Sequence, residues 1–135
     1  MAEVAKILTV DDDADIRQLI DLMVNRAGYE HQVVTTGQQT LAHLASQPVD
    51  LLLLDFRLPD MSGAEIYQQV KTDPAYPADM GVIFLTAWSD NDLSSTLADK
   101  DTFLTKPFDF DEFFAKVEQT LRLYGKAHLI AGWAD

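Results

Sequence analysis

The sequence predicts an α/β fold, a single domain in which helices cover both faces of a parallel five-stranded sheet. Short apolar runs rich in leucine and β-branched residues alternate along the chain with segments of helical periodicity. The run from Leu51 to Leu54 has no polar position, which is typical of a strand buried on both faces. With 135 residues, 47% of them hydrophobic, the chain is long enough for one complete core.

The first half of the chain predicts three strands and two helices. In chain order these are a strand at 6–10, a helix over 16–27, a strand at 31–35, a helix over about 37–46 and a strand at 51–54. Asp13 is a suitable N-cap for the first helix, and Gly28 a suitable stop, because glycine adopts the left-handed conformation that ends many helices. Pro48 follows the end of the second helix.

The second half predicts two more strands and three more helices. In chain order these are a helix around 66–73, a strand at 82–85, a weak helix over about 91–98, a strand at 102–105 and a helix over 110–121. The third helix ends near Asp73, because a residue before proline disfavours the helical region. The segment 90–96 is polar and poor in helix formers, so we expect the fourth helix to be short, mobile or displaced.

Right-handed crossovers leave few ways to arrange these units. The common arrangement is the doubly wound (βα)5, or flavodoxin-like, sandwich with strand order 2-1-3-4-5. Its ligand sites form beyond the carboxyl ends of the strands, where the strand order reverses. We assign the domain to residues 1–125, and expect 126–135 to be a tail that extends the last helix, docks on the surface or begins a linker, with no output domain.

The composition is acidic and free of cysteine. The 22 acidic and 10 basic residues give a formal net charge of −12, which repels nucleic-acid phosphates and anionic lipid. We therefore expect no direct nucleic-acid binding and no membrane partner, and we interpret most of the charge as a solvated surface that aids solubility. Without cysteine, and without an apolar run of about 20 residues, the chain is expected to be cytoplasmic.

Polar residues close or follow four of the predicted strands: Asp11 and Asp12, Asp55, Thr86 and Lys106. We expect them to converge, because the carboxyl ends of parallel strands share one edge. Adjacent carboxylates repel one another unless a cation intervenes, and oxygen ligands suit Mg²⁺. A lysine and a threonine suit a phosphoryl group, which a carboxylate can accept covalently. Each residue alone is more simply a cap, a turn residue or a salt-bridge partner, but the combination points to phosphoryl transfer.

Four separated strings carry a family resemblance. They are Ile-Leu-Thr-Val-Asp-Asp-Asp at 7–13, Leu-Asp-Phe-Arg-Leu-Pro-Asp-Met-Ser-Gly at 54–63, Phe-Leu-Thr-Ala at 84–87 and Phe-Leu-Thr-Lys-Pro-Phe at 103–108. From about residue 5 to 124 the chain resembles the CheY-like receiver domain of two-component response regulators. The resemblance implies a non-enzymatic signalling domain that is phosphorylated by a histidine kinase or phosphotransfer protein, signals to a downstream protein and can form a homodimer.

The resemblance also implies roles for the acidic residues. Asp55 would be the phosphoacceptor. Mg²⁺ would be held by Asp55 and Asp12, by Asp11 partly through water, and by the backbone carbonyl of Arg57.

On the opposite side of the site, Thr86 and the backbone N–H of Ala87 would bind the phosphoryl group, and Lys106 would pair with one of its oxygens. Phe103 would be an aromatic switch that follows Thr86, with a plain core phenylalanine as the alternative. The Lys106–Pro107 bond is expected to be cis.

The chain departs from the family pattern between Thr86 and Lys106. This stretch is shorter than usual, and Asp99-Lys100 stands where the family usually has Gly-Ala. The family usually signals through the face formed by the fourth helix, the fifth strand and the fifth helix, and these departures put that role of the face in doubt. Trp88 flanks the site, and we expect its bulk to shield an acyl phosphate from water.

Two other functions stay open at this point. A Mg²⁺-dependent phosphatase of the haloacid-dehalogenase type would use Asp11 in the Asp-x-Asp motif of residues 11–13, but it would leave Asp55 without a role and it lacks a second acidic pair. An interaction module that has lost phosphorylation is the other alternative, and the complete residue set argues against it.

Overall fold

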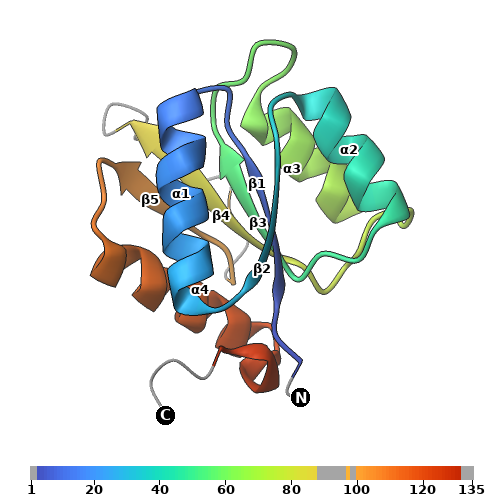
Figure 1. Ribbon diagram of the computed structural model, residues 1–135. Helices are drawn as coiled ribbons and strands as arrows, with labels where there is room; N and C mark the ends of the chain where they lie inside the picture. Colours follow the sequence, from blue (N-terminus) through green and yellow to red (C-terminus); the bar gives the residue numbers. More distant parts are fainter. Residues whose placement is uncertain (1–2, 88–96, 98–99, 132–135) are drawn as a thin grey trace.

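The computed structural model describes residues 3–87, 97 and 100–131. Five strands form one sheet in the order β2-β1-β3-β4-β5 (Figure 1), which confirms the predicted topology. The strands are β1 (Lys6–Val10), β2 (Glu30–Val34), β3 (Leu51–Asp55), β4 (Gly81–Ala87) and β5 (Thr102–Lys106). Every strand pair is parallel, so all the carboxyl ends lie at the same edge of the sheet.

Helices cover both faces of the sheet. Among the described residues they are α1 (Ala14–Ala27), α2 (Gly37–Ser46), α3 (Gly63–Thr72), α4 (Phe110–Leu123) and the short 3₁₀ helix η2 (Ala127–Leu129). α1 and α4 pack on one face, and α2 and α3 on the other (Figure 1). Leu51 and Leu53 face the first pair of helices, whereas Leu52 and Leu54 face the second. The leucine run of β3 is apolar throughout because both of its faces are buried.

The helix ends follow the signals in the sequence. The Asp13 side chain caps α1 by accepting from two backbone N–H groups, and Gly28 ends it in the left-handed region with φ 97°. α3 begins earlier than predicted, at Gly63, where Ser62 and Glu65 form a capping box. β2 is shifted by one residue towards the N-terminus relative to the prediction. The helix predicted over about 91–98 lies outside the described residues.

The described part of the C-terminal tail, residues 126–131, docks on the body of the domain, which is one of the three arrangements expected for the tail. The backbone N–H of Ala5 donates to the carbonyl of Leu129 at 3.0 Å. Leu129 and Ala131 are buried in the core beneath α1 and α4. The ammonium of Lys126 pairs with the Asp50 carboxylate at 3.0 Å. Residues 126–131 are therefore part of the packed domain.

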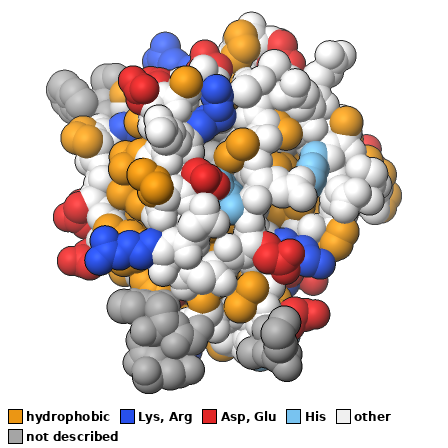
Figure 2. Space-filling model, viewed as in Figure 1, with side chains coloured by type: hydrophobic (Ala, Val, Ile, Leu, Met, Phe, Trp, Pro, Cys, Tyr) orange, Lys and Arg blue, Asp and Glu red, His pale blue; other side chains and the backbone are white. Residues whose placement is uncertain are grey.

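Acidic side chains are spread over the surface. On the face seen in Figure 2, Asp and Glu side chains lie at separate places among basic, polar and apolar ones. This distribution supports the interpretation of the net charge as a solvated surface. None of the helices in the described part of the chain has the length and apolar character needed to cross a membrane.

Candidate functional site

Three carboxylates from neighbouring strand ends form the centre of the candidate site. Asp11 and Asp12 follow β1, and Asp55 is the last residue of β3, which pairs with β1. Each contributes a carboxylate oxygen that lies within 4.8 Å of the other two. Asp11 is fully buried and Asp55 is 7% exposed, whereas Asp12 is exposed. The cluster therefore opens to solvent on the side of Asp12, where the strand order reverses.

Lys106, the last residue of β5, reaches the same cluster. Its Nζ donates to Oδ2 of Asp11 at 2.8 Å and lies 3.5 Å from Oδ1 of Asp55. Within the described residues it is the only side chain that forms an ion pair with these carboxylates. The peptide bond between Lys106 and Pro107 is cis, as expected. One ammonium group against three carboxylates leaves the site short of positive charge.

The electrostatics of the site reflect this shortage. Burial, together with the nearby Asp11 carboxylate, raises the pKa of Asp55 to about 6, although Lys106 opposes the shift. Burial would lower the pKa of Lys106, but its contacts with Asp11 and Asp55 outweigh this effect and raise the pKa. A divalent cation would relieve the repulsion between the carboxylates, and oxygen-only ligands suit Mg²⁺.

Thr86 and Ala87 lie at the same edge of the sheet, at the end of β4. The hydroxyl of Thr86 donates to the carbonyl of Ala87 at 3.0 Å, and Ala87 pairs in register with Lys106. Phe103 is 39% exposed, so its interpretation as a plain core phenylalanine is wrong. Trp88, expected to flank the site, lies outside the described residues.

The loop that follows Asp55 forms a tight turn. The backbone N–H of Arg57 donates to Oδ1 of Asp55 at 3.3 Å, and Arg57 forms an antiparallel bridge with Ser62. The N–H of Gly63 closes the turn by donating to the carbonyl of Phe56 at 2.8 Å. A Cβ at Gly63 would lie only 2.6 Å from the carbonyl oxygen of Asp55, so this position requires glycine. The turn thus holds the Arg57 backbone beside the Asp55 carboxylate.

Two contacts at this edge escaped the sequence interpretation. The guanidinium of Arg17 donates to the backbone carbonyl of Asp11 at 3.0 Å. The carboxylate of Asp60 accepts from the backbone N–H groups of Gly37 and Gln38, at 2.8 and 3.0 Å. The Arg17 contact is local, within six residues, whereas the Asp60 contacts join residues more than 20 positions apart, which only the fold brings together.

A third buried carboxylate, Asp101, lies just before β5, at the edge of the sheet where the strands begin. Its Oδ1 accepts from the N–H of Val82 at 2.9 Å and from the hydroxyl of Tyr124 at 2.7 Å. Its Oδ2 accepts from the hydroxyl of Tyr67 at 2.6 Å and lies 3.2 Å from Nζ of Lys71. Asp101, Tyr67, Lys71 and Tyr124 are named the Asp101 cluster below. It joins the starts of β4 and β5 to α3 and α4.

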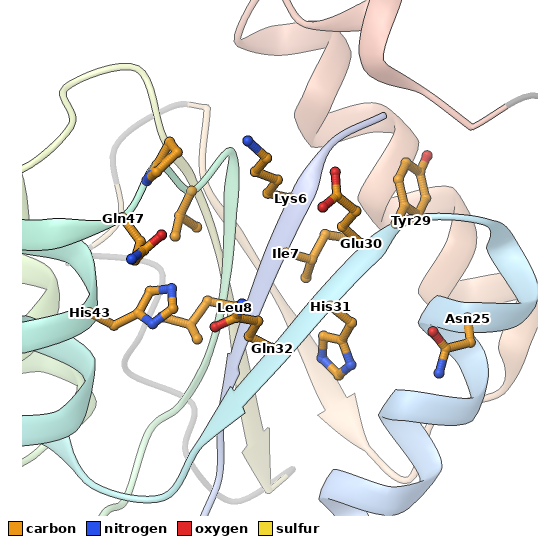
Figure 3. A pocket seen from close by; sticks show the side chains of 12 residues that line it. Lys6, Ile7, Leu8, Asn25, Tyr29, Glu30, His31, Gln32, His43 and Gln47 are labelled. Carbon is orange, nitrogen blue, oxygen red and sulfur yellow. The ribbon is translucent and has the colours of Figure 1, made fainter. Parts of the chain in front are cut away.

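A cleft with a volume of about 470 Å³ runs along the edge strand β2, and its lining does not include Asp11, Asp12 or Asp55. Figure 3 shows that its lining lies on both sides of this strand, with His43 of α2 on one side and His31 on the other. Both ring nitrogens of His31 are engaged, by the hydroxyl of Thr9 at 2.7 Å and the carboxylate of Asp21 at 2.8 Å. The chemistry of the site therefore rests on the acidic edge and not on this cleft.

Comparison with known sequences gives one family. Residues 7–118 match the family described as the response regulator receiver domain. The phosphate regulon transcriptional regulatory protein PhoB of Pseudomonas aeruginosa is 37% identical over 121 residues, which cover 88% of this chain and 52% of that protein. The chain thus spans about half the length of this curated relative.

Solved structures give the same result. The CheY-like response regulator receiver domain protein of Methanospirillum hungatei superposes with a TM-score of 0.80 at 25% identity, covering 92% of this chain and 98% of that one. The response regulator TrrA of Thermotoga maritima, solved in complex with Mg²⁺-BeF, has a TM-score of 0.76 at 35% identity, covering 87% of this chain and 100% of that one. The similarity therefore extends over nearly the whole fold.

Proposed function

The chain belongs to the response regulator receiver family of two-component systems, and we propose that it signals by accepting a phosphoryl group on Asp55. The observation that carries the proposal is the position of this carboxylate. It stands at a strand end, almost buried, beside two further carboxylates, and it faces Lys106 at 3.5 Å. Such a group combines a nucleophilic oxygen with the means to bind both a cation and an anion.

We propose that Mg²⁺ is the cation. Asp11, Asp12, Asp55 and the backbone carbonyl of Arg57 would hold it, and the donor set fits because it consists of oxygen atoms in a site short of positive charge. When bound, the ion supplies charge neutralisation for the incoming phosphoryl oxygens. The magnesium complex of TrrA, a relative at 35% identity, supports this choice.

The proposed reaction is transfer from a phosphohistidine of a histidine kinase or phosphotransfer protein. A carboxylate oxygen of Asp55 forms a P–O bond while the P–N bond of the donor breaks. The electron pair of that bond leaves with the imidazole nitrogen, which takes up a proton. Lys106 then pairs with a phosphoryl oxygen, and the Thr86 hydroxyl and the Ala87 N–H bind the others.

The acyl phosphate carries a charge of about −2, in place of the −1 of the ionised carboxylate, and three acceptor oxygens, which draw the ends of β4 and β5 towards the site. Thr86 and the exposed Phe103 are the proposed switch residues. Phosphorylation would thus alter the surface of β5, which a downstream protein in the cytoplasm reads. PhoB is named a transcriptional regulatory protein, so a DNA-binding effector is our first candidate for that protein.

The phosphatase alternative has less support. It requires Asp11 as the nucleophile, but Asp11 is fully buried and its carboxylate pairs with Lys106 at 2.8 Å. Asp55, which that mechanism does not use, is the more accessible of the two carboxylates.

Intact mass measurement after incubation with Mg²⁺ and a small acyl-phosphate donor tests the proposal. The wild-type protein should gain the mass of one phosphoryl group, and Asp55→Asn should gain none. Asp111→Asn, which changes an exposed acid at the start of α4, is the matched control and should label like the wild type. A wild-type protein that never gains the group, or an Asp55→Asn variant that labels normally, contradicts the proposal.

A further inference from the structure

Asp60 connects two loops at the site edge of the sheet. Its carboxylate accepts from the N–H groups of Gly37 and Gln38, the first two residues of α2. These groups have no partner within their own helix. The hydroxyl of Thr36 serves the next one, the N–H of Gln39, at 3.1 Å. The start of α2 therefore depends on a carboxylate that belongs to the loop between β3 and α3.

The same loop also packs against α2 through its neighbouring residue. The side chain of Met61 packs directly against Gly37 in the first turn of α2. A Cβ at Gly37 would collide with Met61, so this contact depends on glycine. The carboxylate of Asp60 and the side chain of Met61 thus hold the tip of the loop at one place. These contacts join the loop between β3 and α3 to the start of α2, two segments that lie far apart in the sequence.

The loop determines the surroundings of Asp55. It begins directly after Asp55, and its Arg57 N–H donates to Oδ1 of Asp55 at 3.3 Å. The bridge between Arg57 and Ser62 joins its two sides, and Asp60 lies at the tip between them. With the tip released from α2, the Arg57 backbone and the Asp55 carboxylate could rotate relative to one another.

We propose that Asp60 is a positioning residue of the phosphoacceptor site. Asp60 lies outside the group of carboxylates formed by Asp11, Asp12 and Asp55, and each of its two carboxylate oxygens accepts from a backbone N–H of α2. By anchoring the loop 56–62 to α2, it fixes the Asp55 carboxylate and the Arg57 backbone in the arrangement that binds Mg²⁺. The inference rests on the proposed function, since it concerns the affinity of that same site for the ion.

Calorimetric titration with Mg²⁺ well below the unfolding temperature tests the inference with two variants. Asp60→Ala removes two hydrogen bonds from the start of α2 and releases the loop. Thr36→Ala, the matched control, removes a capping bond from the same helix without touching the loop. We expect Asp60→Ala to bind Mg²⁺ about 10-fold more weakly, in the range found for residues that orient metal ligands. Thr36→Ala should lower thermal stability but keep the wild-type affinity.

Asp60→Asn provides a third point, because its amide oxygen can replace one of the two acceptors. Its Mg²⁺ affinity should lie between those of wild type and Asp60→Ala. Faster amide exchange at Gly37 and Gln38 in Asp60→Ala verifies that the anchor has been broken. Unchanged affinity in Asp60→Ala, or an equal loss in Thr36→Ala, overturns the inference while leaving the proposed function intact. A wild-type protein without affinity for Mg²⁺ overturns both.

Discussion

The two edges of the sheet hold buried carboxylates that are satisfied to very different degrees. Asp101 accepts three hydrogen bonds, from a backbone N–H and two tyrosine hydroxyls, and forms an ion pair with the ammonium of Lys71. At the other edge, Asp11 and Asp55 share Lys106, and the pKa of Asp55 rises to about 6. The carboxylate of Asp101 is therefore satisfied by its protein partners, whereas in the proposed function a cation or a phosphoryl group would complete the acidic site.

β5 connects these two regions. Asp101 lies immediately before its first residue, and Lys106 is its last. The start of the strand is tied to α3 and α4, while its far end carries the lysine that changes partners in the proposed reaction. In the proposed function, a change of charge at the site would move the end of β5 without releasing its start, so the residues that stabilise the domain would be separate from those that switch.

Replacing Asp101 should have the largest effect on stability. Asp101→Asn leaves the mostly buried side chain of Lys71 beside a neutral group, and it replaces one of the two carboxylate oxygens that accept from tyrosine hydroxyls with an NH₂ group that cannot accept. Breaking a buried pair in this way costs roughly 3–5 kcal/mol of unfolding free energy. Urea denaturation measures the loss, and the exposed Asp111→Asn should stay within about 0.5 kcal/mol of wild type. An Asp101→Asn variant as stable as wild type would show that the Asp101 cluster does not stabilise the domain.

The matching substitution at the site should act in the opposite direction. The pKa of Asp55 is raised above its unfolded value of 3.8 to about 6, so ionisation of this group begins to oppose folding above pH about 4, and the full penalty is present above pH about 6. Asp55→Asn should therefore stabilise the metal-free protein at pH 8 by roughly 2 kcal/mol. The gain should vanish below pH about 4, where the carboxyl is protonated in both states. Thermal unfolding in a chelating buffer measures this difference, and a destabilised Asp55→Asn at pH 8 speaks against a charge-deficient site.

Removing a single hydroxyl group from the Asp101 cluster should cause a smaller loss of unfolding free energy. Tyr124→Phe removes a hydroxyl that donates to Asp101 at 2.7 Å and accepts from Lys71 at 2.7 Å. A hydrogen bond to a charged group contributes about 1.5 kcal/mol, and Tyr124→Phe should lose about that much. Tyr76→Phe removes the same atom from a tyrosine outside the cluster and serves as the control in the same denaturation series. Equal effects in both variants would show that the cluster has no special role.

The sequence predicts the acidic edge well and the Asp101 cluster not at all. Asp11, Asp55 and Lys106 each end or follow a strand, and parallel pairing brings all strand ends to one edge, so their convergence follows from topology alone. Asp101 meets Tyr67 and Tyr124 across 34 and 23 residues of chain. That meeting depends on the packing of two helices against the sheet, which hydrophobic periodicity does not specify in detail.

Finer features show the same limit. The start of α3 was predicted too late because the tight turn before Gly63 depends on the close approach of the Asp55 carbonyl, which only the folded backbone reveals. The anchor formed by Asp60 depends on the placement of α2 beside a loop more than 20 residues away. Sequence patterns thus predict which residues share an edge, but not which polar contacts hold that edge in place.

The smallest expected effect is on the pH dependence of Mg²⁺ binding. The ion needs ionised carboxylates, and the raised pKa of Asp55 means that this group begins to take up a proton near pH 6. The affinity should therefore fall by about 10-fold between pH 7 and pH 5, whereas a carboxylate with an unshifted pKa would keep its affinity over that range. Calorimetric titrations at pH 5, 6, 7 and 8 measure the dependence. Asp55→Asn is the control variant, and any residual Mg²⁺ binding by it should not weaken between pH 7 and pH 5. An affinity that stays flat from pH 5 to 8 in the wild type would mean that Lys106 already compensates Asp55, and the contrast with Asp101 would then rest on hydrogen bonding alone.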